Sequence, residues 1–143
     1  MGSQARILVV DDNRAVVKII QGVLQRQGFE VLTAFDGEEG LEKAIKEKPD
    51  LIILDIVMPG LDGYQVCRRL QCDPATLRIP VLMLTVKGQI NEEPRPWEKR
   101  DQFSRIQERI AGFDAGAVDF LSKPVTAREL IERVKSLLWF GKA

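Results

Sequence analysis

Residues 51–54 read Leu-Ile-Ile-Leu, an aliphatic run that contains no polar residue. A strand with one face in water alternates apolar and polar residues, whereas an uninterrupted run is typical of a strand buried on both faces of a parallel sheet. Asp55 follows the run directly, and Pro59 and Gly60 break the chain soon afterwards. The run therefore predicts a central strand that ends in a carboxylate, at the edge where open α/β sheets place their ligands.

Similar runs recur along the chain, and apolar residues at helical spacing lie between them. Helices that join parallel strands give right-handed crossovers and cover both faces of the sheet. The pattern predicts a single doubly wound α/β domain over residues 1–143, without an internal repeat or a second domain. The predicted strands are residues 7–10, 29–34, 51–54, 81–84 and 118–121.

Local signals mark the ends of the predicted helices. Polar residues that can accept hydrogen bonds from the first turn precede the apolar stripes of the first, second and last helices. The second helix is expected to turn Leu41, Ala44 and Ile45 inward, and turns are expected to explain Gly60 and Gly63. The predicted caps are Asp12 or Asn13 for the first helix, Asp36 with Glu39 as a capping box for the second, and Thr126 with Glu129 as a capping box for the last.

Composition excludes several classes of function. The 21 basic and 21 acidic residues cancel, so nothing indicates nucleic acid or an anionic membrane as the main partner. The chain has no histidine, which removes the commonest general base and every Ser-His-Asp arrangement. No apolar run approaches the roughly 20 residues that span a bilayer. Cys67 and Cys72 match no metal or redox motif, and we expect two reduced thiols in a cytoplasmic protein.

Polar residues follow four of the predicted strands, at the ends that meet on one edge of the sheet. Three carboxylates gathered there would repel one another, and Mg²⁺, which prefers carboxylate and water oxygens, would keep all three ionised. A carboxylate can also attack phosphorus and form an aspartyl phosphate. Taken alone, an acidic pair after a strand is more often a solvated turn or a helix cap than a binding site, and that interpretation stays open. The residues are Asp11, Asp12, Asp55, Thr85 and the run Ser122-Lys123-Pro124.

Four segments together resemble the receiver domain of two-component response regulators, over nearly the whole chain. They are ILVVDDN (7–13), DIVMPGLDGYQVCRRL (55–70), IPVLMLT (79–85) and AGAVDFLSKP (115–124). The resemblance implies a flavodoxin-like sheet of strand order 2-1-3-4-5. It also implies that a sensor histidine kinase or a histidine phosphotransfer protein donates a phosphoryl group to an aspartate.

By motif position, the resemblance implies that Asp55 is the phosphoacceptor. Asp11 and Asp12 would hold Mg²⁺ directly or through water, and the backbone carbonyl of Val57 would supply a further ligand. Metal and protein donors would then spread the charge on the transferring group.

The resemblance assigns the remaining roles to later motifs. Thr85 would hydrogen-bond the phosphoryl group, and Lys123 would pair with it, aimed by a cis bond to Pro124. Phe120 occupies the position of the family's switch aromatic, which turns inward when Thr85 moves toward the phosphate. The surface that changes would be formed by the predicted strand at 118–121, by the helix that precedes it (helix four) and by the last helix.

Two departures from the family pattern stand out. Val86 replaces the small residue usual after Thr85, and its branched side chain is expected to narrow access to the pocket. An insertion at about residues 87–101 lengthens the connection between strand four and helix four. Helix four is expected to begin near Pro96, after an irregular loop, and to pack on the sheet through Phe103, Ile106, Ile110 and Phe113.

The preferred function is therefore a receiver that passes its signal to a downstream effector protein or to a fused output domain, without itself contacting nucleic acid or a membrane. It would not be an enzyme, apart from slow autodephosphorylation. One alternative is a receiver-fold interaction module that works without phosphorylation. Another is an aspartyl-phosphate hydrolase, which would need a second aspartate two residues after Asp55, where this chain has Val57.

Overall fold

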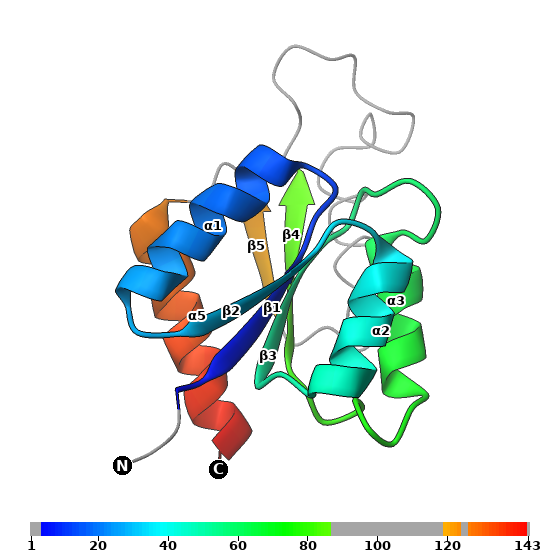
Figure 1. The fold of residues 1–143 in the computed structure, drawn as a ribbon. Coiled ribbons are helices and arrows are strands. Elements are labelled where there is room, and N and C mark those ends of the chain that lie inside the picture. Colours follow the sequence, from blue (N-terminus) through cyan, green and yellow to red (C-terminus); the bar gives the residue numbers. More distant parts are fainter. Residues whose placement is uncertain (1–3, 87–118, 124–125, 143) are drawn as a thin grey trace, which may run out of the picture.

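The computed structural model describes residues 4–86, 119–123 and 126–142, and strands and helices alternate over residues 4–86 (Figure 1). The predicted fourth helix, the insertion at 87–101 and the bond between Lys123 and Pro124 lie outside these residues. The strands are β1 (Arg6–Val10), β2 (Glu30–Ala34), β3 (Leu51–Asp55), β4 (Val81–Val86) and β5 (Asp119–Lys123), and the helices are α1 (Arg14–Arg26), α2 (Gly37–Glu47), α3 (Gly63–Gln71) and α5 (Ala127–Lys142).

All the strands are parallel and form one sheet in the order β2-β1-β3-β4-β5, so the predicted flavodoxin-like order is confirmed. The helices α1 and α5 cover one face, and α2 and α3 cover the other (Figure 1). Val10 pairs with Leu54 in the register of β1 and β3. The residues that follow this pair therefore leave the sheet side by side at its carboxyl edge.

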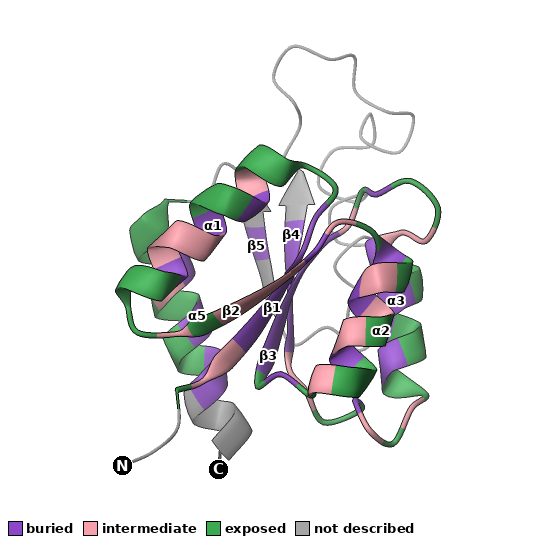
Figure 2. Ribbon diagram, in the orientation of Figure 1, coloured by how far each residue is buried: buried purple, intermediate pink, exposed green. Residues whose placement is uncertain are grey.

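The core consists of two apolar layers, one on each face of the sheet. Ile52 and Leu54 of β3 join the layer beneath α2 and α3, whereas Leu51 and Ile53 join the layer beneath α1 and α5. All four side chains are buried, as Figure 2 shows for the whole length of β3. The aliphatic run of β3 thus serves both layers, and each such side chain stabilises the fold by about 1.5–3 kcal/mol.

The helix starts follow the predicted caps, with one difference. Asn13, one of the two predicted candidates, caps α1, and Asp36 caps α2 by accepting a hydrogen bond from the Glu39 N–H at 2.7 Å. The Glu39 side chain does not return to its cap, because it accepts from the Phe35 N–H at 2.8 Å. This contact joins α2 to the end of β2, so the predicted capping box is only half formed.

Two further expectations need correction. Ile45 is 43% exposed, because it lies beside the buried Ala44 but on the solvent side of α2. Gly60 has a φ of 79° and is explained by a turn, as expected. Gly63 has no such φ and lies inside α3, so its small size rather than its backbone freedom matters there.

Candidate functional site

Asp11, Asp12 and Asp55 form an acidic cluster at the carboxyl edge of the sheet. Each residue offers a carboxylate oxygen, and these oxygens all lie within 4.8 Å of one another. Asp11 and Asp55 are buried, with 1% and 3% of their surface exposed, while Asp12 is exposed. The structure thus brings together the three carboxylates that the sequence placed at two different strand ends.

Backbone contacts fix Asp11 at the end of β1. Its N–H donates to the carbonyl oxygen of Ala34 at 3.1 Å, which continues the pairing with β2 by one residue. Its carboxylate accepts the N–H of Asn13 at 2.9 Å, and the Asn13 side chain caps α1. The start of α1 therefore holds the Asp11 carboxylate in a set orientation.

Asp55 is the last residue of β3 and pairs with Leu84 of β4. The next residue, Ile56, donates its N–H to the Leu84 carbonyl at 3.3 Å and accepts from the N–H of Gly63 at 2.8 Å. The backbone around Asp55 is therefore held by β4 on one side and by the start of α3 on the other.

The acidic cluster suits a hard divalent cation. Neighbouring carboxylates repel one another in the ionised state, and the repulsion grows where the groups are buried. A cation among them removes this repulsion, and ligation by one or two carboxylates with several waters is the arrangement that Mg²⁺ prefers. Because Asp12 is exposed, one side of the cluster is open to solvent.

The backbone places the other predicted site residues near this edge. Thr85 pairs with Ser122, and Val86 pairs with Lys123, in the register of β4 and β5. Phe120 pairs with Met83 in the same ladder. The side chains of Thr85, Val86, Phe120 and Lys123 lie outside the described residues.

Val57 follows β3 by two residues and is 40% exposed. It lies in the loop between β3 and α3, and the role of its backbone carbonyl as a metal ligand stays a prediction. Tyr64 packs against the core layer beneath α2 and α3, as expected for a packing residue.

Sequence reasoning missed a contact beside the cluster. The guanidinium of Arg14, in the first turn of α1, lies 4.1 Å from the centre of the Phe35 ring, just after β2. Stacking of this kind restrains an arginine at an exposed site and stabilises it by about 0.5–1 kcal/mol. No periodicity or motif signals the pair, because the two residues lie on different elements.

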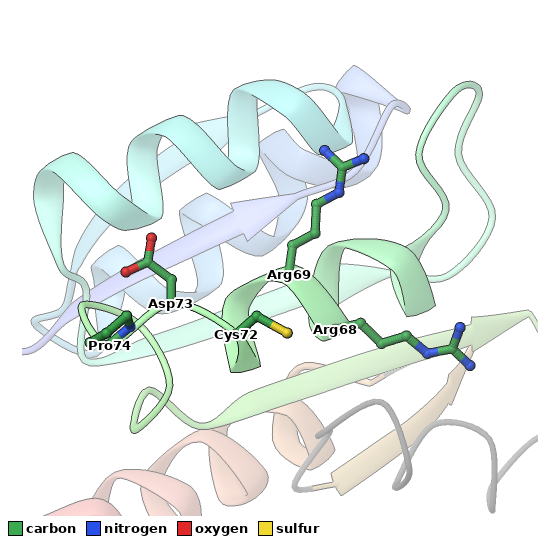
Figure 3. A pocket seen from close by; sticks show the side chains of 5 residues that line it. All are labelled: Arg68, Arg69, Cys72, Asp73 and Pro74. Atoms are coloured by element: carbon green, nitrogen blue, oxygen red, sulfur yellow. The ribbon is translucent and has the colours of Figure 1, made fainter.

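A shallow hollow of about 440 Å³ lies at the far end of α3 (Figure 3). It is lined by Arg68, Arg69, Cys72, Asp73 and Pro74. Arg68 and Arg69 leave the helix in different directions and do not converge on a common point. Gly63 at the opposite end of α3 contacts Asp55, so the hollow is separate from the acidic cluster.

The cysteines carry no visible chemistry. Both are free thiols in the structure. Burial raises the pKa of Cys67 to about 11, so this thiol stays protonated and unreactive near neutral pH. Cys72 is exposed in the hollow at the end of α3.

Among the helices that the structure describes, none combines the length and the apolar character needed to cross a bilayer.

Comparison with known proteins identifies relatives over almost all of the chain. A family model described as "Response regulator receiver domain" matches residues 7–96. The alkaline phosphatase synthesis transcriptional regulatory protein PhoP of Bacillus subtilis is 42% identical over 93% of the chain, and the response regulator PleD of Caulobacter vibrioides is 41% identical over 95%. The chain spans only 48% of PhoP and 26% of PleD.

A solved structure agrees with this grouping. The chemotaxis protein CheY4 of Vibrio cholerae superposes with a TM-score of 0.78 at 30% sequence identity, over 94% of this chain and 99% of that one. The matching part makes up nearly all of that solved chain, whereas it is about half of PhoP and a quarter of PleD.

Proposed function

The chain belongs to the response regulator receiver domain family, and on that premise we propose that Asp55 accepts the phosphoryl group in two-component signalling. The observation that carries this assignment is the acidic cluster. Asp55 is the member that ends β3, and Asp11 and Asp12 approach it from the end of β1. We also take residues 1–143 to form a single receiver domain.

Receiver domains bind Mg²⁺ in an acidic pocket, and the three carboxylates of this chain fit such an ion. Asp11 and Asp12 would hold it, together with Asp55 and the backbone carbonyl of Val57. When bound, the ion neutralises part of the negative charge on the phosphoryl oxygens. The buried position of Asp11, fixed by Ala34 and Asn13, would orient its carboxylate before the ion arrives.

In the transfer step, an oxygen of the Asp55 carboxylate attacks phosphorus on a phosphohistidine. The new oxygen–phosphorus bond forms as the phosphorus–nitrogen bond breaks, and the histidine nitrogen leaves with the bonding electron pair. Thr85 would donate a hydrogen bond to the phosphoryl group, and Lys123 would pair with its charge. Thr85 lies near the carboxyl end of β4, the strand next to β3, and Lys123 ends β5, the strand next to β4. The carboxyl ends of these strands lie on the edge that holds Asp55, which supports these roles.

The aspartyl phosphate would bias an equilibrium between two states of the surface built from helix four, β5 and α5, with Phe120 as the switch aromatic. Val86 would restrict entry of donors and of water to the pocket. Slow hydrolysis of the adduct would reset the domain, so its role is that of a phosphoacceptor rather than a turnover enzyme.

The partners follow from this role. A sensor histidine kinase or a histidine phosphotransfer protein would supply the phosphoryl group in the cytoplasm, and an effector protein or a fused output domain would read the switch. The insertion at 87–101 would either select that output partner or block the dimer that receivers usually form, because it adjoins the face that receivers use for output. The alternative is a tolerated surface insertion, since lengthening a loop costs little free energy.

A direct test is incubation with acetyl phosphate and Mg²⁺ followed by intact-protein mass and peptide mapping. We expect one phosphoryl group per chain, mapped to Asp55, and none in Asp55→Asn, which keeps the side-chain shape but removes the nucleophile. A parent protein that takes up no phosphoryl group would instead support the alternative of a receiver-fold interaction module that works without phosphorylation. An adduct on another residue would contradict the assignment of Asp55.

A further inference from the structure

Gly63, the first residue of α3, packs directly against the backbone of the residue that ends β3. A Cβ atom at this position would lie 2.6 Å from the carbonyl oxygen of Asp55 and 2.7 Å from the Cα of Ile56. Both are backbone atoms, which cannot rotate away as a side-chain end can. Any side chain at position 63 would therefore displace either the end of β3 or the start of α3.

The conformation of Gly63 gives no other reason for a glycine. Gly60, three residues earlier, has a φ of 79°, which only glycine adopts without strain. Gly63 has an ordinary helical backbone that alanine would adopt more readily. The contact with Asp55 is thus the feature that excludes a side chain.

Two sets of hydrogen bonds make the contact a rigid one. The Gly63 N–H donates to the Ile56 carbonyl at 2.8 Å, which ties the helix start to the strand end. Asp62 and Gln65 form a reciprocal capping box, in which Asp62 accepts from the Gln65 N–H at 2.9 Å and the Gln65 side chain accepts from the Asp62 N–H at 3.0 Å. These hydrogen bonds therefore hold the first turn of α3 in place independently of its packing contact with β3.

Strand β4 packs against the other side of the backbone at Asp55 and Ile56. The Ile56 N–H donates to the Leu84 carbonyl at 3.3 Å, and the Cε of Met83 lies 3.0 Å from the Cβ position of Gly63. The backbone at Asp55 and Ile56 is held between β4 and the start of α3, and the space between them does not accommodate a Cβ atom at position 63. A small shift of α3 must move the carboxylate of Asp55 relative to Asp11 and Asp12.

We infer that Gly63 is a positioning residue for phosphorylation, which lets the first turn of α3 set where the Asp55 carboxylate stands within the acidic cluster. The inference rests on the proposed function, since it assumes that Asp55 is the acceptor. Gly63 would not touch the phosphoryl group or the metal. It would act through the Asp55 backbone alone.

The test is Gly63→Ala, compared with Leu70→Ala in the same helix. Leu70 is buried at the other end of α3, so its truncation destabilises the fold without pushing on Asp55. We expect Gly63→Ala to lower the rate of adduct formation from acetyl phosphate by about tenfold or more per folded molecule, because small misplacements of a reacting group are costly. The rise in thermal midpoint with Mg²⁺ alone should also weaken in Gly63→Ala and persist in Leu70→Ala.

A second pair of variants covers the case in which Gly63→Ala does not fold. Asp62→Ala removes the cap that fixes the start of α3, and Asp36→Ala removes the matching cap of α2. Slower adduct formation in Asp62→Ala than in Asp36→Ala supports the inference. Equal rates within each pair, with the same response to Mg²⁺, overturn it while leaving Asp55 as the acceptor. A parent protein that forms no adduct overturns the proposed function and the inference with it.

Discussion

Charged side chains are arranged in opposite ways at the two edges of the sheet, as ion pairs at one edge and as a cluster of like charges at the other. At the amino edge, Arg6 at the start of β1 pairs with Glu30 at 3.0 Å and with Glu47 at 2.8 Å. Its backbone N–H also donates to the Asp50 carboxylate at 2.8 Å. At the carboxyl edge, the same strand leads into Asp11 and Asp12, which gather with Asp55 into a cluster of like charges.

Charges at the amino edge stabilise the fold, whereas the charges at the carboxyl edge are expected to serve function. The hydrogen bond that Arg6 donates to Glu47 is the largest cause that raises the pKa of Arg6, so the amino edge favours the charged state of this guanidinium. At the carboxyl edge the carboxylates oppose one another, and the fold accepts that repulsion where a cation and a phosphoryl group are expected to bind. The strand β1 thus connects a network of ion pairs at one end to a cluster of carboxylates at the other.

The largest predicted effect concerns the cation at the carboxyl edge. Mg²⁺ should stabilise the parent protein with millimolar-scale affinity, because the chain supplies few ligands and the ion keeps its waters. At one hundred times the dissociation constant this amounts to about 2.7 kcal/mol. We expect Asp12→Ala to abolish the metal-dependent rise in thermal midpoint. Glu42→Ala, which removes an exposed carboxylate of α2, is the control and should respond as the parent does; an equal response in Asp12→Ala would refute the site.

A smaller effect is predicted at the amino edge. Arg6→Met keeps most of the apolar stem but removes the pairs with Glu30 and Glu47, so the unfolding midpoint should fall, and fall less at high salt. The rate of phosphorylation per folded molecule should stay at the parent value, since Arg6 lies at the opposite end of β1 from Asp11. Arg26→Met on α1 is the matched loss of charge. A changed phosphorylation rate in Arg6→Met would mean that the two edges are coupled.

The smallest predicted effect concerns access to the carboxyl edge. If the branched side chain of Val86 shields the phosphoryl group, Val86→Ala should speed both phosphorylation by acetyl phosphate and hydrolysis of the adduct by a few-fold. Time courses of intact mass measure both rates. Val23→Ala on α1 is a control for loss of the same methyl groups at a partly buried site away from this edge. Unchanged rates in Val86→Ala would show that this residue does not limit access.

The main elements and the acidic cluster could be predicted from sequence because their signals are local. The run at residues 51–54 proved to be β3, and Asn13 and Asp36 cap the helices that follow them. Parallel strands bring their carboxyl ends to one edge, so the meeting of Asp11 with Asp55 follows from the element order. The family resemblance added the strand order, which periodicity alone does not specify.

Contacts between elements could not be predicted in this way. The Glu39 side chain turns to Phe35 rather than to its own cap, and Ile45 faces solvent although it lies beside the buried Ala44. Arg6 and Glu47 are separated by 41 positions in sequence, so no local sequence pattern indicates that they form a pair. Each outcome depends on the exact angle and height at which a helix meets the sheet.

The sequence by itself thus determined an alternating α/β chain with its carboxylates at strand ends, because hydrophobic periodicity and capping act over a few residues. Only the tertiary structure decided that Arg6 forms ion pairs at the amino edge of the sheet. It also decided that α3 packs against the Asp55 backbone at the carboxyl edge, where Gly63 leaves room for the contact. The physical reason is close packing, in which a contact between distant segments is set by all the atoms around it rather than by the residues at its ends.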